Sequence, residues 1–293
     1  TQLIQHLWPI VRLFIPMIAL SIYHFMDKTM LDLLSTEAEV GYYYAADKII
    51  YIPLGLITAI GTVMLPRISS IVGESKEKTE KLLSKSTELS ICMSCAVGFG
   101  IAAIAREFVP LFFGEGYEKC VNLLVLFVPV LFVKSLSNVV DQQYLIPAKC
   151  DNQYTLAVTG GAIVNLICNG LLIPQLGSVG ATLGTLMAEL SALTISAHCA
   201  KKEIHFFRMF SRYSYYLLFG MTMFIAVRFF DLRLDIEQPI IRLLLMIMIG
   251  GGVYSILCMT VWLKVKEKSV FGGILNSLSK KGAIRKEQDE KGY

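Results

Sequence analysis

The sequence predicts an all-α integral membrane protein with about eight transmembrane helices. Hydrophobic residues make up 55% of the 293 residues, and charged residues make up only 17%. An ordinary soluble domain carries about 25% charged residues, and the mean hydropathy here is +0.59. Apolar stretches also recur at lengths near the roughly 20 residues that a helix needs to cross a bilayer. Together these observations indicate a polytopic membrane protein.

Hydropathy divides the chain into eight apolar spans. They cover residues 7–26, 47–65, 89–105, 120–146, 154–173, 178–200, 213–230 and 240–263. The longest outward connection before the seventh span is residues 27–46, which is too short for a soluble catalytic domain.

The first two spans and the loop between them form a hairpin with unusual content. The first span carries Pro9, Arg12 and Pro16, and the second begins on Asp47 and Lys48. A span that only anchors a protein has no use for an arginine or for kinking prolines, whereas spans around a polar path do. The hairpin therefore predicts a polar path through the membrane.

The orientation follows from Lys and Arg residues in alternate loops. Residues 66–88, 147–153, 201–212 and the tail from 264 hold 18 of these residues, and the opposite loops hold six. The positive-inside rule places the first group in the cytoplasm. Residue 1 is then cytoplasmic as well.

Two of these cytoplasmic segments have a predicted structure. Residues 66–88 alternate charged and apolar side chains, which suits either a helix lying on the inner membrane face or a solvated charge run. The tail, residues 266–293, is polar and of mixed charge. We expect the tail to be disordered or loosely bound to the surface.

Polar residues share one helix face in five of the first six spans. In the first span these residues are Arg12, Pro16, Ala19, Tyr23 and Asp27, and in the second Lys48, Tyr51, Gly55, Thr58 and Thr62. In the fourth they are Lys134, Ser137, Asn138, Asp141 and Gln142, in the fifth Thr155, Thr159, Ala162, Asn165 and Asn169, and in the sixth Ser178, Thr182, Thr185, Glu189 and Ser196.

These stripes have two interpretations. Small and hydroxyl residues are common at ordinary helix contacts in membranes. A charge near mid-membrane costs about 3 kcal/mol on insertion scales, so stripes with Arg12, Lys134 or Glu189 are expected to face protein or water. Lys134 and Glu189 can pair with each other structurally or serve a substrate or an ion.

The seventh and eighth spans differ from the first six, because their cores carry no charge. They look like a lipid-facing addition to a six-span unit. The predicted organisation is a six-helix lobe at 1–205, two additional helices at 206–265 and the tail at 266–293.

The sequence lacks the motifs of several enzyme classes. The sequence contains no Gly-x-Ser-x-Gly, no phosphate loop and no His-Glu-x-x-His. The seven cysteines show neither zinc spacing nor a disulfide framework, and the four histidines are scattered. We therefore predict no enzyme activity, no cofactor and no metal site.

Some segments resemble a known family. They are 26–31 (MDKTML), 40–43 (VGYY), 47–50 (DKII), 63–69 (VMLPRIS), 106–117 (REFVPLFFGEGY), 145–147 (LIP) and 177–182 (GSVGAT). They are similar to the Wzx-type polysaccharide flippases of the multidrug/oligosaccharidyl-lipid/polysaccharide exporter superfamily, which includes MATE-like transporters. The resemblance covers most of residues 5–265.

The resemblance implies an architecture. Members have two six-helix lobes around a central cavity, often followed by two extra helices, so this chain would supply the second lobe and the extra pair. The missing N-terminal lobe would be its main partner, and we expect translation to begin upstream of Thr1. Without that lobe, the stripe with Lys134 and Glu189 would face lipid or a second copy of the chain, and transport would fail.

The resemblance also implies a function. The parent protein would flip undecaprenyl-diphosphate-linked oligosaccharide repeat units across a bacterial inner membrane by alternating access, for capsule, exopolysaccharide or O-antigen synthesis. The substrate, membrane lipid and the polysaccharide-synthesis machinery are its expected partners, and nucleic acid is not. The alternatives are a drug/cation antiporter of the same superfamily and an integral-membrane polymerase or ligase, which would need a large outward catalytic loop.

The site residues follow from charge and position. Cationic donors suit a diphosphate, so the predicted substrate-binding residues are Arg12, Lys48 and Lys134, together with Tyr23, Tyr51 and Asn138. The predicted ion-coupling or gating residues are Asp27, Lys28, Asp47, Asp141 and Glu189. An ion pair at the outer gate is an alternative role for Asp27, Lys28, Asp47 and Lys48. Because no nucleotide site is present, we expect an ion gradient to drive transport.

Overall fold

The structure is a computed structural model that describes residues 25–201, 203–233 and 236–265. Residues 25–34 are helical. The elements that follow are α2 (Glu37–Ser69), α3 (Lys76–Phe113), α4 (Lys119–Val140), the π-helix η1 (Asp141–Leu145), α5 (Asp151–Leu176), α6 (Ser178–Ala200), α7 (Phe206–Tyr213), α8 (Tyr215–Asp231) and α9 (Pro239–Val265). No strand occurs among the described residues.

Seven helices of the described part are long and apolar enough to cross a membrane. The predicted all-α membrane fold is therefore confirmed, and the sixth predicted span coincides with α6. The first predicted span, 7–26, lies almost entirely outside the described residues, as do its Arg12 and Tyr23. The predicted tail at 266–293 lies outside them as well.

The prediction that residues 27–46 form a loop is wrong. These residues continue a helix to position 34, and α2 already begins at Glu37. Thr36 caps α2, because its Oγ1 accepts a hydrogen bond from the backbone N–H of Glu39 at 3.5 Å. Two glutamates in the first turn add a favourable interaction with the helix dipole.

Residues 66–88 do not form a separate helix on the membrane face, but most of their charged side chains are exposed, as a solvated charge run requires: Arg67, Glu74, Lys76, Glu77, Lys78, Lys81 and Lys85. The helix α2 runs through Pro66 to Ser69, and after a short turn the cap Ser75 starts α3 at Lys76. Further along α3, Leu83 and Glu88 are buried against other helices. The alternating pattern therefore reflects a helix with one face buried in the protein and an exposed face that carries most of the charges.

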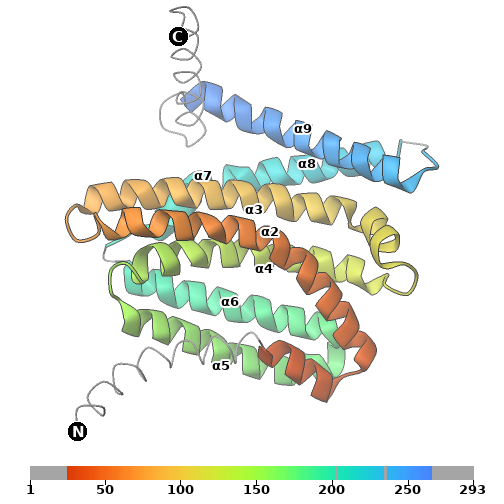
Figure 1. Cartoon of the computed structure of the whole chain (residues 1–293), viewed down its shortest axis with the longest axis horizontal. Helices are drawn as coiled ribbons and strands as arrows, with labels where there is room; N and C mark the ends of the chain where they lie inside the picture. Colours follow the sequence, from red (N-terminus) through yellow and green to blue (C-terminus); the bar gives the residue numbers. More distant parts are fainter. Residues whose placement is uncertain (1–24, 202, 234–235, 266–293) are drawn as a thin grey trace, which may run out of the picture.

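The helices lie side by side in a layered order. Figure 1 shows α4 and α6 in the middle, with α5 on one side and α3, α8 and α9 on the other. The helices α5 and α6 form a close antiparallel pair. A Cβ at Gly180 would lie 2.4 Å from the backbone oxygen of Leu172, so this contact requires glycine.

The helices α8 and α9 pack against α3. Arg228 forms an ion pair with Glu107 of α3 at 3.1 Å, and Arg242 of α9 forms one with Asp231 of α8 at 2.6 Å. Tyr216 donates a hydrogen bond to Glu88 at 3.2 Å. These two helices, whose cores carry no charge, thus have paired charges at one end. The division of the chain at residue 205 remains a prediction.

Candidate functional site

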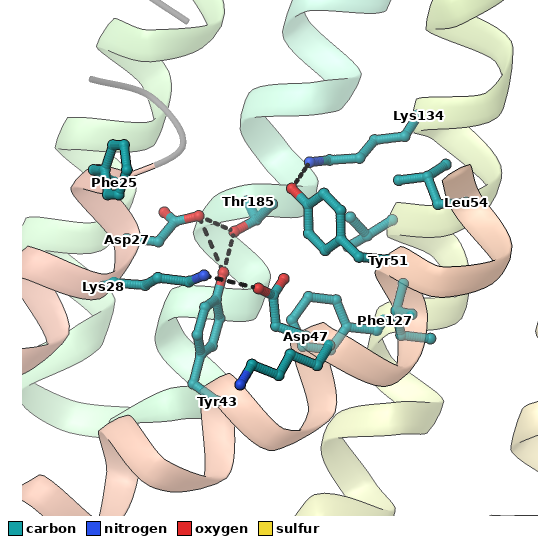
Figure 2. Close-up of a pocket in the computed structure, with 13 residues that line it drawn as sticks. Phe25, Asp27, Lys28, Tyr43, Asp47, Tyr51, Leu54, Phe127, Lys134 and Thr185 are labelled. Carbon is teal, nitrogen blue, oxygen red and sulfur yellow. Dashed lines mark hydrogen bonds and ion pairs between the residues drawn. The ribbon is translucent and has the colours of Figure 1, made fainter. Parts of the chain in front are cut away.

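A cavity of about 310 Å³ lies between the helical segment 25–34, α2, α4 and α6 (Figure 2). Most of the predicted site residues that the structure describes border it. Its lining comprises Phe25, Asp27, Lys28, Tyr43, Asp47, Lys48, Ile50, Tyr51, Leu54, Phe127, Val130, Lys134 and Thr185.

Asp27 is one of two buried carboxylates in this cavity, and Asp47 is the other. The Asp27 side chain is bonded by four neutral donors, and the residue is only 6% exposed. The amides of Asn165 and Asn169 each donate to Oδ1 at 2.7 Å. The hydroxyls of Thr185 and Tyr43 donate to Oδ2 at 2.8 and 3.1 Å. No ion pair among the described residues involves Asp27.

This arrangement surrounds the Asp27 carboxylate with neutral donors. A carboxylate removed from water is unfavourable unless it is paired or protonated. Neutral donors lower that penalty without cancelling the charge. Asp27 is therefore a buried negative charge, held by neutral donors, at the wall of the first cavity.

Three helices supply the donors: α5 provides both asparagines, α6 provides Thr185 and α2 provides Tyr43. Asn165 and Asn169 are four residues apart on α5 and so lie on one face. Gly184 on α6 leaves room for Asn169, since a Cβ there would lie 2.0 Å from the side-chain oxygen of Asn169. The close packing of α5 and α6 thus shapes the Asp27 cluster.

A second polar group lies next to Asp27. Lys28 and Asp47 form an ion pair at 3.1 Å, and the Lys28 ammonium sits 4.3 Å from the ring centroid of Tyr44. The predicted pairing within this group is confirmed for Lys28 and Asp47. The side chain of Lys48, one position further, is exposed.

Lys134 connects three helices. Its ammonium donates to the hydroxyl of Tyr51 on α2 at 2.8 Å and pairs with Glu189 on α6 at 3.2 Å (Figure 2 shows the first contact). The side chains of Lys134 and Glu189 are only 12% and 10% exposed. Of the two alternatives left open by the sequence, the structure shows the ion pair, and a role toward substrate or ion remains a prediction. The expectation that this stripe faces lipid or a second copy is wrong, because the lobe itself encloses both charges.

A second cavity, of about 300 Å³, adjoins the first and shares Tyr51, Leu54 and Lys134 with it. The end of α4 and η1 line it with the polar side chains of Ser137, Asn138, Asp141 and Gln142. Glu189 and Tyr154 complete its polar lining. The described site residues thus gather around two adjoining cavities.

One polar stripe remains on the outside of the described part. Lys48, Tyr51, Gly55 and Thr62 of α2 are exposed, and Thr58 between them is half-buried. Four of these five residues also border the two cavities. Both cavities therefore open along α2, on the face that carries this stripe.

Four residues around Asp27 were not among the predicted site residues, although all except Tyr43 belong to the predicted polar stripes. They are Tyr43, Asn165, Asn169 and Thr185. A signal was present, because two amides four residues apart in an apolar span need a polar partner. The identity of that partner was not readable, since Asp27 lies 138 residues from Asn165.

A family model described as "Lipid II flippase MurJ" matches residues 5–249. The chain belongs to this family. The predicted recognition of a flippase of the exporter superfamily is thereby confirmed. The family is one of translocators rather than enzymes, in agreement with the motif analysis, and the chain is a multi-pass membrane protein.

Two curated relatives carry related names. The "Probable low-salt glycan biosynthesis flippase Agl15" of Haloferax volcanii is 23% identical over 60% of this chain and 37% of its own length. The "Putative O-antigen transporter" of Escherichia coli K12 is 26% identical over 61% of this chain and 43% of its own length. The chain therefore spans less than half the length of these relatives.

Two solved structures share the fold. A lipid II flippase MurJ in an inward closed conformation matches with a TM-score of 0.72 and 16% identity, covering 86% of this chain and 53% of that one. An outward-facing MATE multidrug transporter of the MOP superfamily matches with a TM-score of 0.54 and 20% identity, over 75% and 53% of the two chains. The predicted MATE-like fold is thus confirmed, and it is shared with MurJ.

Proposed function

We propose that this chain forms one lobe of a transporter that flips an undecaprenyl-diphosphate-linked oligosaccharide from the inner to the outer leaflet of a bacterial cytoplasmic membrane. The observation that carries the proposal is the pair of polar cavities inside an apolar lobe of the MurJ family. The sugar and diphosphate of such a substrate must cross hydrocarbon along a polar path, while its polyprenyl tail stays in lipid.

A second lobe would complete this path. The α2 stripe borders both cavities and is exposed in the described part of the chain. Polar side chains are unfavourable against lipid, so this stripe is the face on which a partner lobe would close. Two such lobes that rock against each other give alternating access.

Asp27 is the residue that we assign to energy coupling. Its carboxylate is buried, has four neutral donors and has no basic partner among the described residues. Binding and release of a proton or a monovalent cation there would change the contacts between segment 25–34, α2, α5 and α6. An ion gradient could drive the conformational cycle through this change.

A drug/cation antiporter is the second candidate, and one observation favours it. Lys134 is already neutralised by Glu189, which leaves Asp141 as an acidic group of the second cavity without an ion pair among the described residues. An antiporter for cationic drugs would use such acidity. A polymerase or ligase has no such support.

Export by a deletion strain separates these functions. Removal of the intact gene should stop surface-polysaccharide export and cause lipid-linked repeat units to accumulate on the inner leaflet. Restoration by the gene, but not by a drug efflux transporter, would support flipping. Normal export without any accumulation, together with increased drug sensitivity, would support the antiporter.

A further inference from the structure

The second cavity contains polar atoms that the protein leaves unbonded. Ser137 is 7% exposed, and its hydroxyl has no hydrogen-bond partner among the described residues. The Oδ1 atom of Asp141 also has no hydrogen bond within 3.5 Å in the described part of the chain, although the buried hydroxyl of Ser196 lies near this carboxyl group. A buried polar atom without a partner costs about 1–3 kcal/mol. Both Ser137 and Asp141 line the cavity, so a ligand there can supply the missing bonds.

A nearby serine shows that buried serine hydroxyls in α4 are not generally without a hydrogen bond. Ser135 is fully buried, and its hydroxyl donates to the backbone oxygen of Phe132 at 2.8 Å. Serines within helices commonly satisfy themselves in this way. Ser137, two positions further along the same helix, faces the cavity without such a bond.

The charge of the cavity argues against a diphosphate. Lys134 is its basic residue, and Glu189 and Tyr51 already hold that ammonium. Asp141 adds a carboxylate that no ion pair of the described residues neutralises. An anionic ligand would be repelled, whereas hydroxyl and amide groups would find both acceptors and donors.

The size and lining of the cavity suit a ring-shaped polar ligand. Its volume of about 300 Å³ is that of a small ligand pocket. Tyr154 adds an aromatic ring with a hydroxyl at one end, whereas the ring and hydroxyl of Tyr51 are in contact with the Lys134 ammonium. The π-helix η1 places Asp141 and Gln142 at the cavity, and π-helical turns frequently occur at functional sites.

We propose that this cavity binds one saccharide ring of the lipid-linked oligosaccharide, with Asp141 and Ser137 bonded to its hydroxyl groups. This inference rests on the proposed function. It separates the roles of the two cavities: the Asp27 cavity takes the coupling ion, and the Asp141 cavity takes a sugar. The diphosphate then binds to basic residues outside the Asp141 cavity.

The first test measures flipping by the intact protein in vesicles, with lipid-linked oligosaccharide isolated from the producing strain as the probe. Ser137→Ala and Asp141→Asn should each raise KM by about tenfold, because the first removes a hydrogen bond to the substrate and the second replaces a charge-assisted hydrogen bond by a weaker neutral one. The dependence of flipping on the ion gradient should not change. Ser135→Ala is the matched control, and its KM should equal that of the wild-type protein.

The outcomes differ for a sugar and for a cation. If Asp141→Asn shifts the sodium or proton dependence and leaves KM unchanged, the cavity binds a cation and the proposal is overturned. If Ser137→Ala behaves like Ser135→Ala and Asp141→Asn leaves KM unchanged, the cavity binds no part of the substrate.

A second test does not require active variants. A photo-crosslinking amino acid at position 142, in the cavity, should capture glycolipid with a radiolabelled sugar, whereas the same group at Leu156, an exposed position of α5, should not. Equal or absent capture at both positions contradicts the sugar site even if the protein flips. Capture at position 142 in a protein that does not flip supports the site and refutes the proposed function.

Discussion

The amide of Asn169 donates to the Asp27 carboxylate at 2.7 Å, although the two residues lie 142 positions apart. This bond joins the start of the described chain to α5, and Thr185 and Tyr43 extend the cluster to α6 and α2. One carboxylate is therefore in contact with three helices of the lobe. Any change in its charge must affect their packing.

Loss of the Asp27 charge should uncouple transport from the ion gradient. Asp27→Asn keeps the size of the side chain but removes the negative charge that binds a cation. We expect export to fall to the level of the deletion strain, with membrane abundance retained. Asp32→Asn is the control, because Asp32 lies on the same helical segment and is exposed. Gradient-driven flipping by Asp27→Asn in vesicles would rule out this role.

Added bulk at Gly184 should disturb the same cluster without altering a charge. A Cβ there would lie 2.0 Å from the Asn169 side-chain oxygen, so Gly184→Ala must displace that side chain. Overpacking of this kind costs about 1–3 kcal/mol. Thermal unfolding of the purified chain in detergent should show a lower Tm.

Gly251→Ala provides the comparison for Gly184→Ala. No atom would lie within 4 Å of its Cβ, and alanine is the better helix former by about 1 kcal/mol. We expect an unchanged or higher Tm for this variant. Equal losses of Tm at positions 184 and 251 would mean that the close contact at Gly184 does not determine stability.

The Lys134–Glu189 pair should appear as a strong coupling between two substitutions. Removal of one partner of a buried ion pair costs about 3–5 kcal/mol, because the other charge is left unpaired. Lys134→Met or Glu189→Gln alone should therefore reduce membrane abundance, and the double variant should recover much of it. Immunoblots of membrane fractions measure this directly. Additive losses in the double variant would mean that the two charges act independently.

The apolar spans could be predicted from the sequence, because mean hydropathy depends only on the residues within one continuous segment. The sequence also contains a signal for the start of α2, since Thr36 and Glu39 have the spacing of a capping box. The charged residues around Asp27 favoured a loop instead. The extension of α3 was missed for a related reason. Its charged first turns resemble a surface helix, and only the tertiary contacts of Glu88 show that this segment is partly buried.

The candidate site was less predictable than the fold. Helical spacing correctly grouped Lys134, Asn138 and Asp141 on one face, and the structure places all three at one cavity. The donors around Asp27 were not predictable, because they come from three helices whose relative rotation no local pattern fixes. Whether Lys134 was free or paired was undecided for the same reason. Its partner Glu189 lies on α6.

Oxidative crosslinking can verify how α9 packs on α3. The sulfur atoms of Cys92 on α3 and Cys258 on α9 lie 4.0 Å apart, and a small side-chain rotation brings them to the bonding distance of about 2.05 Å. Treatment with a mild oxidant should link the two helices. After proteolysis in the connection near Lys201, the two fragments should migrate together under non-reducing conditions and separate after reduction.

The control variants distinguish this contact from random collision within the membrane. Cys258→Ser should abolish the link, whereas Cys168→Ser should not, because Cys168 lies on α5, at the opposite edge of the structure from α9 (Figure 1). The link should also form in dilute detergent, since it is intramolecular. If Cys258→Ser still yields linked fragments, or if no link forms in the wild-type chain, then α9 does not pack on α3 through Cys92 and Cys258.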